Sequence, residues 1–494
     1  MARSAPAPAR WTLPDQPDLA WLRGRAKRLR RAAEHGDPEA LDLLAAYDPG
    51  DLPITLARAQ RVLARAHGFA GWTKLVDHIE VRAALSRPMD PTGSAGGPPD
   101  SDADRFLRLA CLSYTQPSVA GDARAMLDAD ASLSTRSAAT MAACSRAADL
   151  ARRLHADPGA ATREDGPHRW PPLLYLCYSR LGLGDPVATL RVLLDAGADP
   201  NSGFLWRGLP SPFTALTGVL GGGERDEPPH PAAADLAEIL LAAGTDPNDN
   251  QAFYNRQFRP DNSHLGPLLR HRAGHPRPSP WRNRLGTAYP SPEQMVGEHL
   301  RSAARNGFDE RVRILLDHGV DPNTRGYHPI LGDQTAYEVA VRFGHARAAA
   351  MLETAGGRSD RLDEVDLLLA AAYSGDAGTV ALLRDRVGDL PRRRPGALRT
   401  AAELHDVPAL SRLLELGYDV DRSGPDRISA LHEAALRGDA AMCAWLIARG
   451  ADRTARDRRF DATPAGWAAH AGHRDLADSL TPDSLTPDSL TPES

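Results

Sequence analysis

A period of 33 residues constrains this chain of 494 residues more than any other feature of its sequence. Three cysteines are spaced 33 residues apart in similar surroundings: Cys111, Cys144 and Cys177. The segment LLDAGADPN at 193–201 recurs as LLAAGTDPN at 240–248 and as LLDHGVDPN at 315–323. A fixed period of about 20 to 50 residues is typical of proteins built from stacked repeats.

The last complete copy predicts a helical hairpin. Thr463 and Pro464 are typical of the N-cap and first residue of a helix, and Gly472 is typical of the left-handed residue that ends one. A second helix is expected over residues 474–480. One hairpin cannot bury its apolar face alone, so neighbouring hairpins must stack. The predicted fold class is therefore all-α.

At these residues the chain resembles the ankyrin-repeat family. The family's Thr-Pro-Leu-His-x-Ala-Ala opening is similar to residues 429–435 (SALHEAA) and to residues 463–469 (TPAGWAA), where Gly466 replaces the family's histidine. A third partial match begins at Thr335. The resemblance implies an α-solenoid of about ten or eleven hairpins over residues 104–480.

The resemblance also implies which residues hold the repeats together. In the family, the histidine equivalent to His432 bonds within and between repeats. The expected structural residues are Thr335, Gly344, His345, Leu431, His432, Ala434, Ala435, Gly438, Thr463, Pro464, Gly472 and His473.

Residues 1–87 predict a separate helical module, with helices within 19–46 and 54–80. The spacing of Trp72, Leu75, Val76 and Ile79 is that of an apolar helix face. The module is similar to a small helical module that precedes ankyrin repeats in many bacterial proteins, and this likeness implies no function.

The remaining segments interrupt or flank the repeats. Residues 88–103 predict a flexible linker because they are rich in Pro, Gly and Ser. Loop insertions are expected near 220–231 and 272–292. Residues 481–494, where Ser-Leu-Thr-Pro recurs with a period of five, predict a disordered tail.

Composition excludes several function classes. Only Lys27 and Lys74 among the 59 basic residues are lysines, and neither follows a phosphate-binding glycine loop. A P-loop NTPase is excluded, and so is a kinase or lysine Schiff-base enzyme after residue 74. The net charge of −5 disfavours nucleic acid as a partner. The preference for arginine over lysine indicates a GC-rich bacterial genome.

The sequence predicts a cytoplasmic protein that does not cross a membrane. No run of about 18 apolar residues occurs, and residues 1–11 lack the apolar core of a signal peptide. Four cysteines in so long a chain fit a reducing compartment.

Each candidate for catalysis or metal binding has a simpler interpretation. The three periodic cysteines are expected to be buried thiols on equivalent helices. His271 and His275 have helical ligand spacing, but Gly274 and Pro276 indicate that the helix ends before His275. His264 completes this weak cluster. His432 has a structural role by resemblance, so no catalytic, cofactor or metal residue is expected.

Two kinds of segment remain that could contact phosphate. The basic runs 23–31 and 392–394 are expected to be a solvated helix face and a loop. The glycine runs 182–184 and 221–223 do not follow strands, so neither predicts a dinucleotide-binding turn.

Aromatic side chains concentrate in residues 200–290, which hold 8 of the 27 in the chain. One interpretation is that they fill a gap in the core of an irregular region. The other is that they form a recognition surface on the loops, because Tyr and Trp are common interface anchors. The candidate partner-binding residues are Phe204, Trp206, Tyr254, Phe258 and Tyr327.

These observations favour a non-enzymatic scaffold that binds a protein partner through the concave face and finger loops of the solenoid. The chain is expected to be monomeric and to bind no cofactor, nucleic acid or membrane. The alternative is an effector or enzyme whose activity lies in the N-terminal module or in residues 200–290. A pocket with convergent acids, bases or a metal would favour that alternative.

Overall fold

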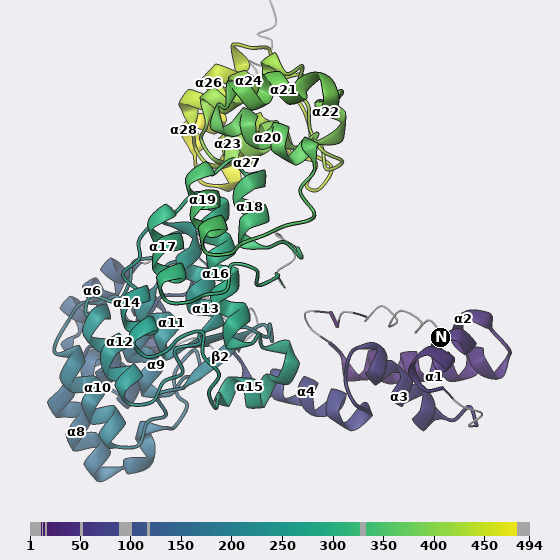
Figure 1. Cartoon of the computed structure of the whole chain (residues 1–494). Coiled ribbons are helices and arrows are strands. Elements are labelled where there is room, and N and C mark those ends of the chain that lie inside the picture. Colours follow the sequence, from purple (N-terminus) through teal and green to yellow (C-terminus); the bar gives the residue numbers. More distant parts are fainter. Residues whose placement is uncertain are drawn as a thin grey trace, which may run out of the picture. The chain divides into compact units, whose positions relative to one another are not determined.

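Helices dominate the computed structural model, which confirms the all-α prediction (Figure 1). They account for 59% of the chain, and strands for 3%. The structure describes residues 11, 13–14, 17–49, 53–87, 101–115, 119–326 and 332–481. The chain divides into two compact units, Met1–Met295 and Val296–Ser494. Within the described ranges, no helix combines the length and apolar character that a membrane span requires.

Four helices open the first unit: α1 (Leu19–Glu34), α2 (Pro38–Tyr47), α3 (Leu56–Ala66) and α4 (Trp72–Leu85). They overlap the two ranges where the sequence predicts helices, 19–46 and 54–80, and α4 continues five residues beyond the second range. Leu75 and Ile79, from the predicted apolar stripe, pack with Leu22 and Ala64 in a small core. A second core joins α1, α2 and α3 around Val62.

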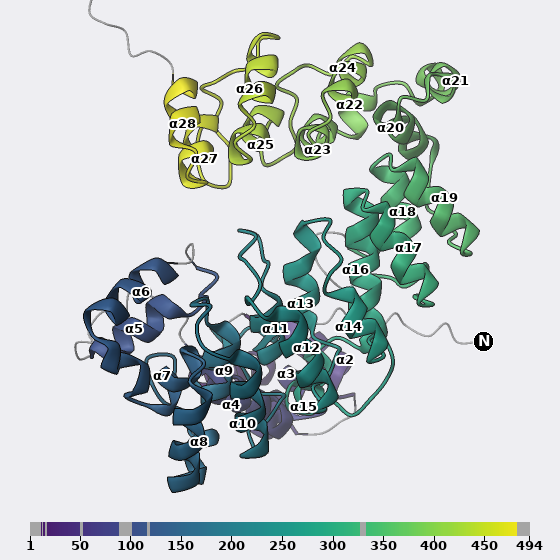
Figure 2. The same cartoon turned by 90° about the vertical axis from the view of Figure 1, so that its left-hand side faces the viewer.

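Five helical hairpins follow in the first unit. Each has a first helix and a second helix: α5 (Asp102–Ala110) and α6 (Ala120–Ala129), α7 (Ala138–Ala143) and α8 (Ala147–Ala156), α9 (Pro172–Tyr178) and α10 (Pro186–Asp195), α11 (Ala215–Leu220) and α12 (Ala233–Ala242), and α13 (Asn250–Asn255) and α14 (Leu265–Arg270). First helices α7, α9 and α11 pack side by side, and second helices α8, α10 and α12 do the same (Figure 2).

Six more hairpins extend to the end of the second unit: α16 (Pro292–Asn306) and α17 (Asp309–Asp317), α18 (Ala336–Arg342) and α19 (Ala346–Thr354), α20 (Glu364–Ser374) and α21 (Ala377–Val387), α23 (Ala397–Glu403) and α24 (Val407–Glu415), α25 (Ala430–Leu436) and α26 (Ala440–Ile447), and α27 (Pro464–His470) and α28 (Arg474–Leu480). The described residues therefore hold eleven hairpins. A continuous core runs from α20 to α28.

One small sheet connects the N-terminal helices to the repeats of the first unit. Strands β2 (Gly203–Trp206) and β3 (Pro212–Thr214) form an antiparallel hairpin between α10 and α11, with Phe204 opposite Phe213. Strand β1 (Ser86–Arg87), directly after α4, pairs in parallel with β2. The end of the N-terminal helical segment therefore contacts the loop of a repeat.

One of the two insertions differs from the loop that the sequence predicts. Residues 272–292 contain a short helix, α15 (Pro280–Leu285), which packs against α4 and buries Trp281. An exposed loop is therefore the wrong description of the middle of this segment. Residues 221–231 hold no helix, and Gly222 has a φ of +83° with the Asn255 carbonyl oxygen 2.5 Å from where a Cβ would lie.

Arg180 holds the 221–231 insertion against the repeat before it. Its buried guanidinium donates to the carbonyl oxygens of Pro228 at 2.8 Å and Gly218 at 2.7 Å. The predicted linker and tail lie almost entirely outside the described residues, which leave out 88–100 and 482–494.

The stacking of first helices predicts a position-dependent response to charge. Ala435 in α25 is fully buried, so Ala435→Asp places a carboxylate among apolar side chains. We expect the free energy of unfolding to fall by about 3 kcal/mol or more in urea titrations. Ala444→Asp, on the exposed side of the neighbouring helix α26, is the matched control and should change it by about 0.5 kcal/mol. Equal effects of the two substitutions would contradict the stacked arrangement.

Candidate interaction surface

Most first helices begin with two side chains that cap each other. The N-cap side chain accepts the N–H of the third helical residue, here called the N3 residue, and the N3 side chain accepts the N-cap N–H. Seven first helices in the described part of the chain carry such a pair: Ser101 and Asp104, Ser137 and Thr140, Thr214 and Thr217, Ser291 and Gln294, Thr335 and Glu338, Asp363 and Asp366, and Ser429 and His432. This arrangement satisfies amide groups in the first turn of the helix.

In several hairpins the N3 side chain also reaches the next hairpin. Three such contacts are Thr217 Oγ1 to Asp249 Oδ2 at 2.9 Å, Ser359 Oγ to Glu338 Oε1 at 2.7 Å, and His432 Nε2 to the Ala462 carbonyl oxygen at 3.2 Å. Each partner lies in the loop before the following first helix or at the N-cap of that helix. The N3 residue therefore fixes the loop that follows, as the resemblance implied for His432.

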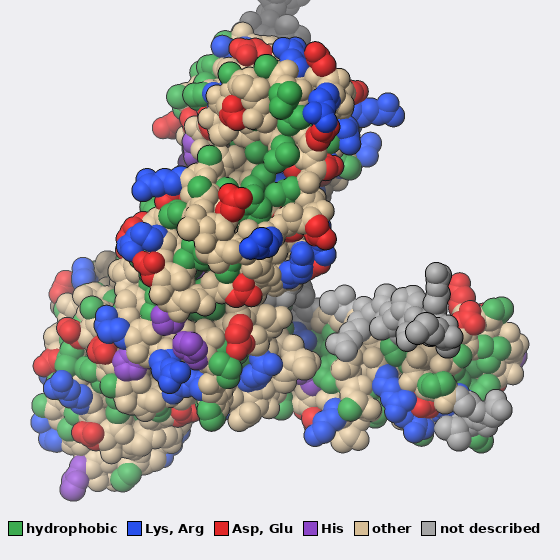
Figure 3. Space-filling model, viewed as in Figure 1, with side chains coloured by type: hydrophobic (Ala, Val, Ile, Leu, Met, Phe, Trp, Pro, Cys, Tyr) green, Lys and Arg blue, Asp and Glu red, His purple; other side chains and the backbone are tan. Residues whose placement is uncertain are grey.

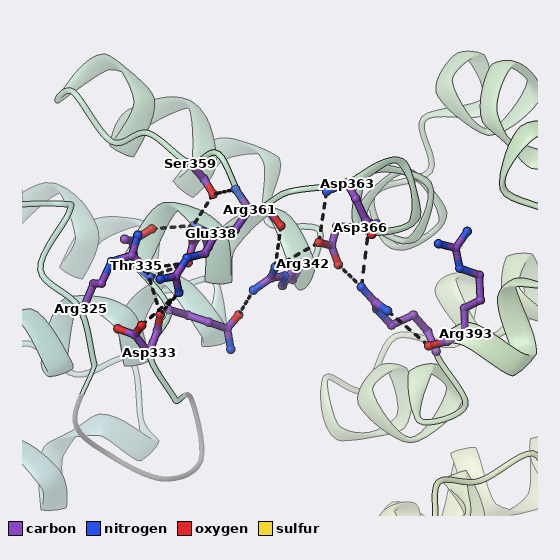
Figure 4. Close-up of polar contacts among 12 residues, drawn as sticks. Arg325, Asp333, Thr335, Glu338, Arg342, Ser359, Arg361, Asp363, Asp366 and Arg393 are labelled. Carbon is purple, nitrogen blue, oxygen red and sulfur yellow. Dashed lines mark hydrogen bonds and ion pairs between the residues drawn. The ribbon is translucent and has the colours of Figure 1, made fainter. Parts of the chain in front are cut away.

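In the second unit the N3 residues Glu338 and Asp366 are buried carboxylates (Figure 4). Arg342 connects the starts of the two helices that carry these carboxylates. Its guanidinium donates to Gln334, just before the N-cap of α18, at 2.7 Å and to Asp366 of α20 at 3.1 Å. Arg394 donates to the other oxygen of Asp366 at 2.8 Å. Burial acts to raise the pKa of Asp366, but these hydrogen bonds outweigh it and the pKa lies below its usual value.

The predicted glycine and histidine of the repeat motif pack on each other between hairpins. A Cβ on Gly438 would lie 2.6 Å from the imidazole of His473, so a larger residue does not fit. His345 lies in the same way against Gly307 and also bonds the Arg305 carbonyl oxygen at 2.9 Å. Burial lowers the pKa of His345, although the bond to that carbonyl opposes the shift.

The other predicted motif residues occupy structural positions. Leu431, His432, Ala434 and Ala435 are buried. Thr335 and Thr463 are N-caps, Pro464 is the first residue of α27, and Gly344 and Gly472 have φ of +72° and +87°.

The regular stack changes between α20 and α23, where α22 (Leu390–Arg393) is inserted. Helix α20 packs against the second helix α24 there. Arg412 of α24 donates to the carbonyl oxygens of Ala372 at 2.5 Å and Tyr373 at 2.6 Å, at the end of α20. The basic run 392–394 is therefore partly helical, and Arg394 is half-buried and paired with Asp366 rather than solvated.

The aromatic side chains of residues 200–290 lie mostly in the core. Five of the eight are buried: Phe204, Phe213, Phe253, Trp281 and Tyr289. Phe204 is 1% exposed and stacks on Trp170 at 4.9 Å and on Phe213 at 5.6 Å between ring centroids. The expectation that Phe204 lies on an exposed loop is wrong, because the β2–β3 hairpin turns it inward.

Trp206 is half-buried and lies in β2, the strand that pairs with β1 at the end of the N-terminal helical segment. It lies opposite Arg87 of β1, and its ring contacts Phe213 edge-on at 6.5 Å. Arg87 itself is buried, and its guanidinium contacts Glu164 at 2.5 Å and the Arg169 carbonyl oxygen at 3.2 Å. The face of this finger loop is therefore already occupied by residues of the same chain.

Tyr254 and Phe258 form a half-buried pair at the end of α13. Their rings meet edge-on at 5.3 Å, and the Tyr254 hydroxyl donates to Glu224 at 2.9 Å. The fifth candidate, Tyr327, lies outside the described residues.

The loop before α27 presents an aromatic side chain that the sequence reasoning missed. Phe460 is 62% exposed and lies edge-on to Trp467 at 5.9 Å. The guanidinium of Arg459 lies 5.0 Å from the centre of the Phe460 ring. The sequence held one signal of this exposure: Phe460 stands three positions before the Thr-Pro that starts a first helix, and such positions belong to a finger loop.

Asp457 holds this loop in shape. Its buried carboxylate accepts hydrogen bonds from the backbone N–H groups of Arg459 and Phe460, both at 2.7 Å, and from Trp467 Nε1 at 3.0 Å. Burial acts to raise the pKa of Asp457, but these bonds outweigh it and lower the pKa to about 2. Phe460 is therefore presented on a fixed loop.

Exposed arginines lie near Phe460 on two neighbouring loops. Arg458 and Arg459 directly precede it in the sequence, Asp461 follows it, and Arg427 is exposed on the loop before α25. Among the described residues, no carboxylate lies within 4.0 Å of these three guanidinium groups. The first helices beside them carry paired charges instead, because Arg399 and Arg437 both contact Glu433.

The cysteines and the histidine cluster occupy structural positions. All four cysteines are buried and free, and burial raises the pKa of Cys144, Cys177 and Cys443 to about 12. Helix α14 ends at Arg270, before His275, and His271 bonds Glu238 at 3.0 Å. Within the described part of the chain, no group of three or more His, Cys, Asp or Glu could hold a metal ion.

The low pKa of Asp457 predicts a loss of stability in acid. A carboxyl whose pKa is lower in the folded than in the unfolded chain stabilises the fold above its unfolded pKa, and that contribution is lost as pH falls toward the folded pKa. We expect Asp457→Asn to destabilise the α27 hairpin at neutral pH. Between about pH 4 and pH 2, the free energy of unfolding should decrease less in the variant than in the wild type. Urea unfolding across that pH range measures both decreases. An unchanged acid profile in Asp457→Asn would contradict this assignment.

Comparison with known proteins agrees with the geometry of the second unit. Residues 398–447, from α23 to the end of α26, match the family model "Ankyrin repeats (many copies)". The chain is 31% identical over 148 residues to the E3 ubiquitin-protein ligase XBAT33 of Arabidopsis thaliana, a match that covers 28% of this chain and 26% of the relative. It is 34% identical over 92 residues to Protein PhlB of Serratia liquefaciens, covering 19% of this chain and 40% of that protein. The chain therefore spans about a quarter of the length of the Arabidopsis relative and about two fifths of the length of the Serratia relative. Its residues 398–447 are similar to ankyrin repeats.

Proposed function

We propose that this chain is a non-enzymatic scaffold that binds a protein partner through the finger loops and first helices of α23–α28. The observation that carries the proposal is Phe460, an exposed ring on a loop fixed by Asp457, within a stack of hairpins similar to ankyrin repeats. Aromatic and arginine side chains on a rigid support are the commonest interface anchors. Phe460, Arg459 and Arg427 are the anchors we infer.

The surface chemistry supports a protein partner more than a nucleic acid. On the face drawn in Figure 3, acidic and basic side chains are interspersed over both units, with no broad area of one charge. The chain as a whole carries a net charge of −5, which opposes binding to a uniform polyanion. A protein surface offers mixed charges that match such a face.

The proposal extends to the setting of the protein. We infer a monomer in a bacterial cytoplasm, supported by the use of arginine over lysine and by four buried, unpaired cysteines. The burial of five of the eight aromatic side chains in residues 200–290 argues against a recognition surface there. An effector or enzyme whose activity lies in the N-terminal module or in residues 200–290 is the alternative proposal. The name of the Arabidopsis relative denotes a ligase, but only 26% of that protein is matched.

The proposal predicts that Phe460→Ala weakens capture of the partner. Affinity purification of the tagged full chain from its native lysate, with quantitative mass spectrometry, would identify the specifically bound protein. We expect its dissociation constant to rise by a factor of about 30 in Phe460→Ala, corresponding to about 2 kcal/mol for an anchor. The melting temperature should change little, because Phe460 is largely exposed.

Leu382→Ala is the matched control for this experiment. Leu382 is 65% exposed but lies on the second helix α21, outside the proposed surface. Its truncation should leave partner binding within about twofold. Equal loss of binding in the two variants, or none in Phe460→Ala, would refute the proposed surface.

A further inference from the structure

The solvent face of α1 has an unusual concentration of positive charge. This helix of 16 residues holds six cations, from Arg23 to Arg31, and one acidic residue, Glu34. Residues 1–87 contain 14 of the 59 basic residues and 10 of the 64 acidic residues, so the segment carries +4 while the whole chain carries −5. The excess of positive charge therefore belongs to this segment and is concentrated on α1.

Among the residues that the structure describes, most of these cations have no carboxylate partner. Arg23, Lys27, Arg28 and Arg31 are exposed, and among the described residues the one ion pair on α1 joins Arg30 to Glu34 at 3.5 Å. Leu22, Ala26 and Ala33 are buried, which directs the cations to the opposite, solvent-exposed side. The four exposed cations, with Trp21, are called the α1 basic face below.

Charge on this face opposes the stability of its own helix. Arg23, Lys27 and Arg31 are four residues apart, so neighbouring like charges repel along one side of the helix. Asp18 caps the start of α1 by accepting the N–H of Ala20 at 2.8 Å, but no acidic residue lies within the first turn to offset the cations that follow. Binding of carboxylates to these cations would remove the repulsion.

An aromatic group borders the basic face. Trp21 is 41% exposed, and the guanidinium of Arg25 lies 5.2 Å from its ring centre and 4.2 Å from that of Trp11. Burial lowers the pKa of Arg25, with repulsion from Arg28 adding to the effect. Trp21 is therefore held in place beside the cations, with part of its surface open to an apolar side chain of a partner.

We propose that the α1 basic face docks an acidic segment of a partner protein that also carries an apolar side chain for Trp21. Carboxylates four residues apart on a helix are separated by about 6 Å, the same spacing as Arg23, Lys27 and Arg31. Exposed carboxylates of Glu34, Asp37, Glu39 and Asp42 bound the face at the end of α1 and on α2. They would repel a nucleic acid that continues past the face, whereas a short acidic protein segment ends before them.

The test uses the full chain and labelled poly-L-glutamate of about 20 residues, long enough to cover a helix of this length. Fluorescence anisotropy should show binding that weakens as salt is raised. The variant R23Q/K27Q/R31Q should bind at least about tenfold more weakly, because it removes three exposed cations that pair with carboxylates of the peptide. Its helix content by circular dichroism should not fall, since the substitutions remove repulsion.

The control R225Q/R277Q/R474Q removes the same charge from exposed positions elsewhere and should keep binding within about twofold. A second variant, Trp21→Ala, should weaken an acidic peptide that contains leucine more than it weakens poly-L-glutamate. Equal loss in the two triple variants would overturn the proposal. Tighter binding of a single-stranded oligothymidine or of phosphatidylserine vesicles than of the acidic peptides would also overturn it.

Discussion

In several hairpins the first turn of the first helix lies inside the stack, and its amide groups therefore need partners other than water. Thr335, Ser429 and Thr214 are all at most 5% exposed, so an unsatisfied N–H at these helix starts would cost about 1–3 kcal/mol. The pairing of N-cap and N3 side chains meets this requirement. The same N3 side chains then bond the following hairpin, which couples the start of one helix to the position of the next loop.

Different side chains serve this role in different hairpins. Thr217 donates a hydrogen bond to the buried Asp249, and His432 bonds a backbone carbonyl oxygen. The carboxylate of Asp366 accepts hydrogen bonds from two arginines. Burial lowers the pKa of His432, although the bond to the Ala462 carbonyl opposes the shift. The partners of Thr217 and His432, and Arg394 as a partner of Asp366, lie in the loop before the next first helix or at its N-cap, so loop geometry and stacking depend on the same atoms. The fixed presentation of Phe460 follows from this dependence.

Local signals in the sequence were sufficient for the elements themselves. The N-cap at Thr463, the left-handed Gly472 and the second helix over 474–480 appear where predicted, because each depends on a few neighbouring residues. The alternation of short helices with glycine turns was enough to predict an all-α repeat fold.

Features that depend on distant partners could not be predicted. Phe204 comes after a sequence pattern that predicts a loop. Its side chain points into the core because Phe204 pairs opposite Phe213 in the β2–β3 hairpin. Trp281 lies in a segment rich in Pro and Arg, and contact with α4 is what stabilises its short helix. Phe460 was missed because exposure of a loop residue depends on how its loop is held, here by Asp457.

Hydrogen–deuterium exchange of His432→Ala, compared with the wild type, tests the coupling between hairpins most directly. If the N3 residue joins neighbouring hairpins, exchange should accelerate both in α25 and in residues 455–463 with the first turn of α27. His470→Ala, at an exposed position of α27, should leave both regions unchanged. Acceleration confined to α25 would contradict the account, because His432 would then stabilise only its own helix.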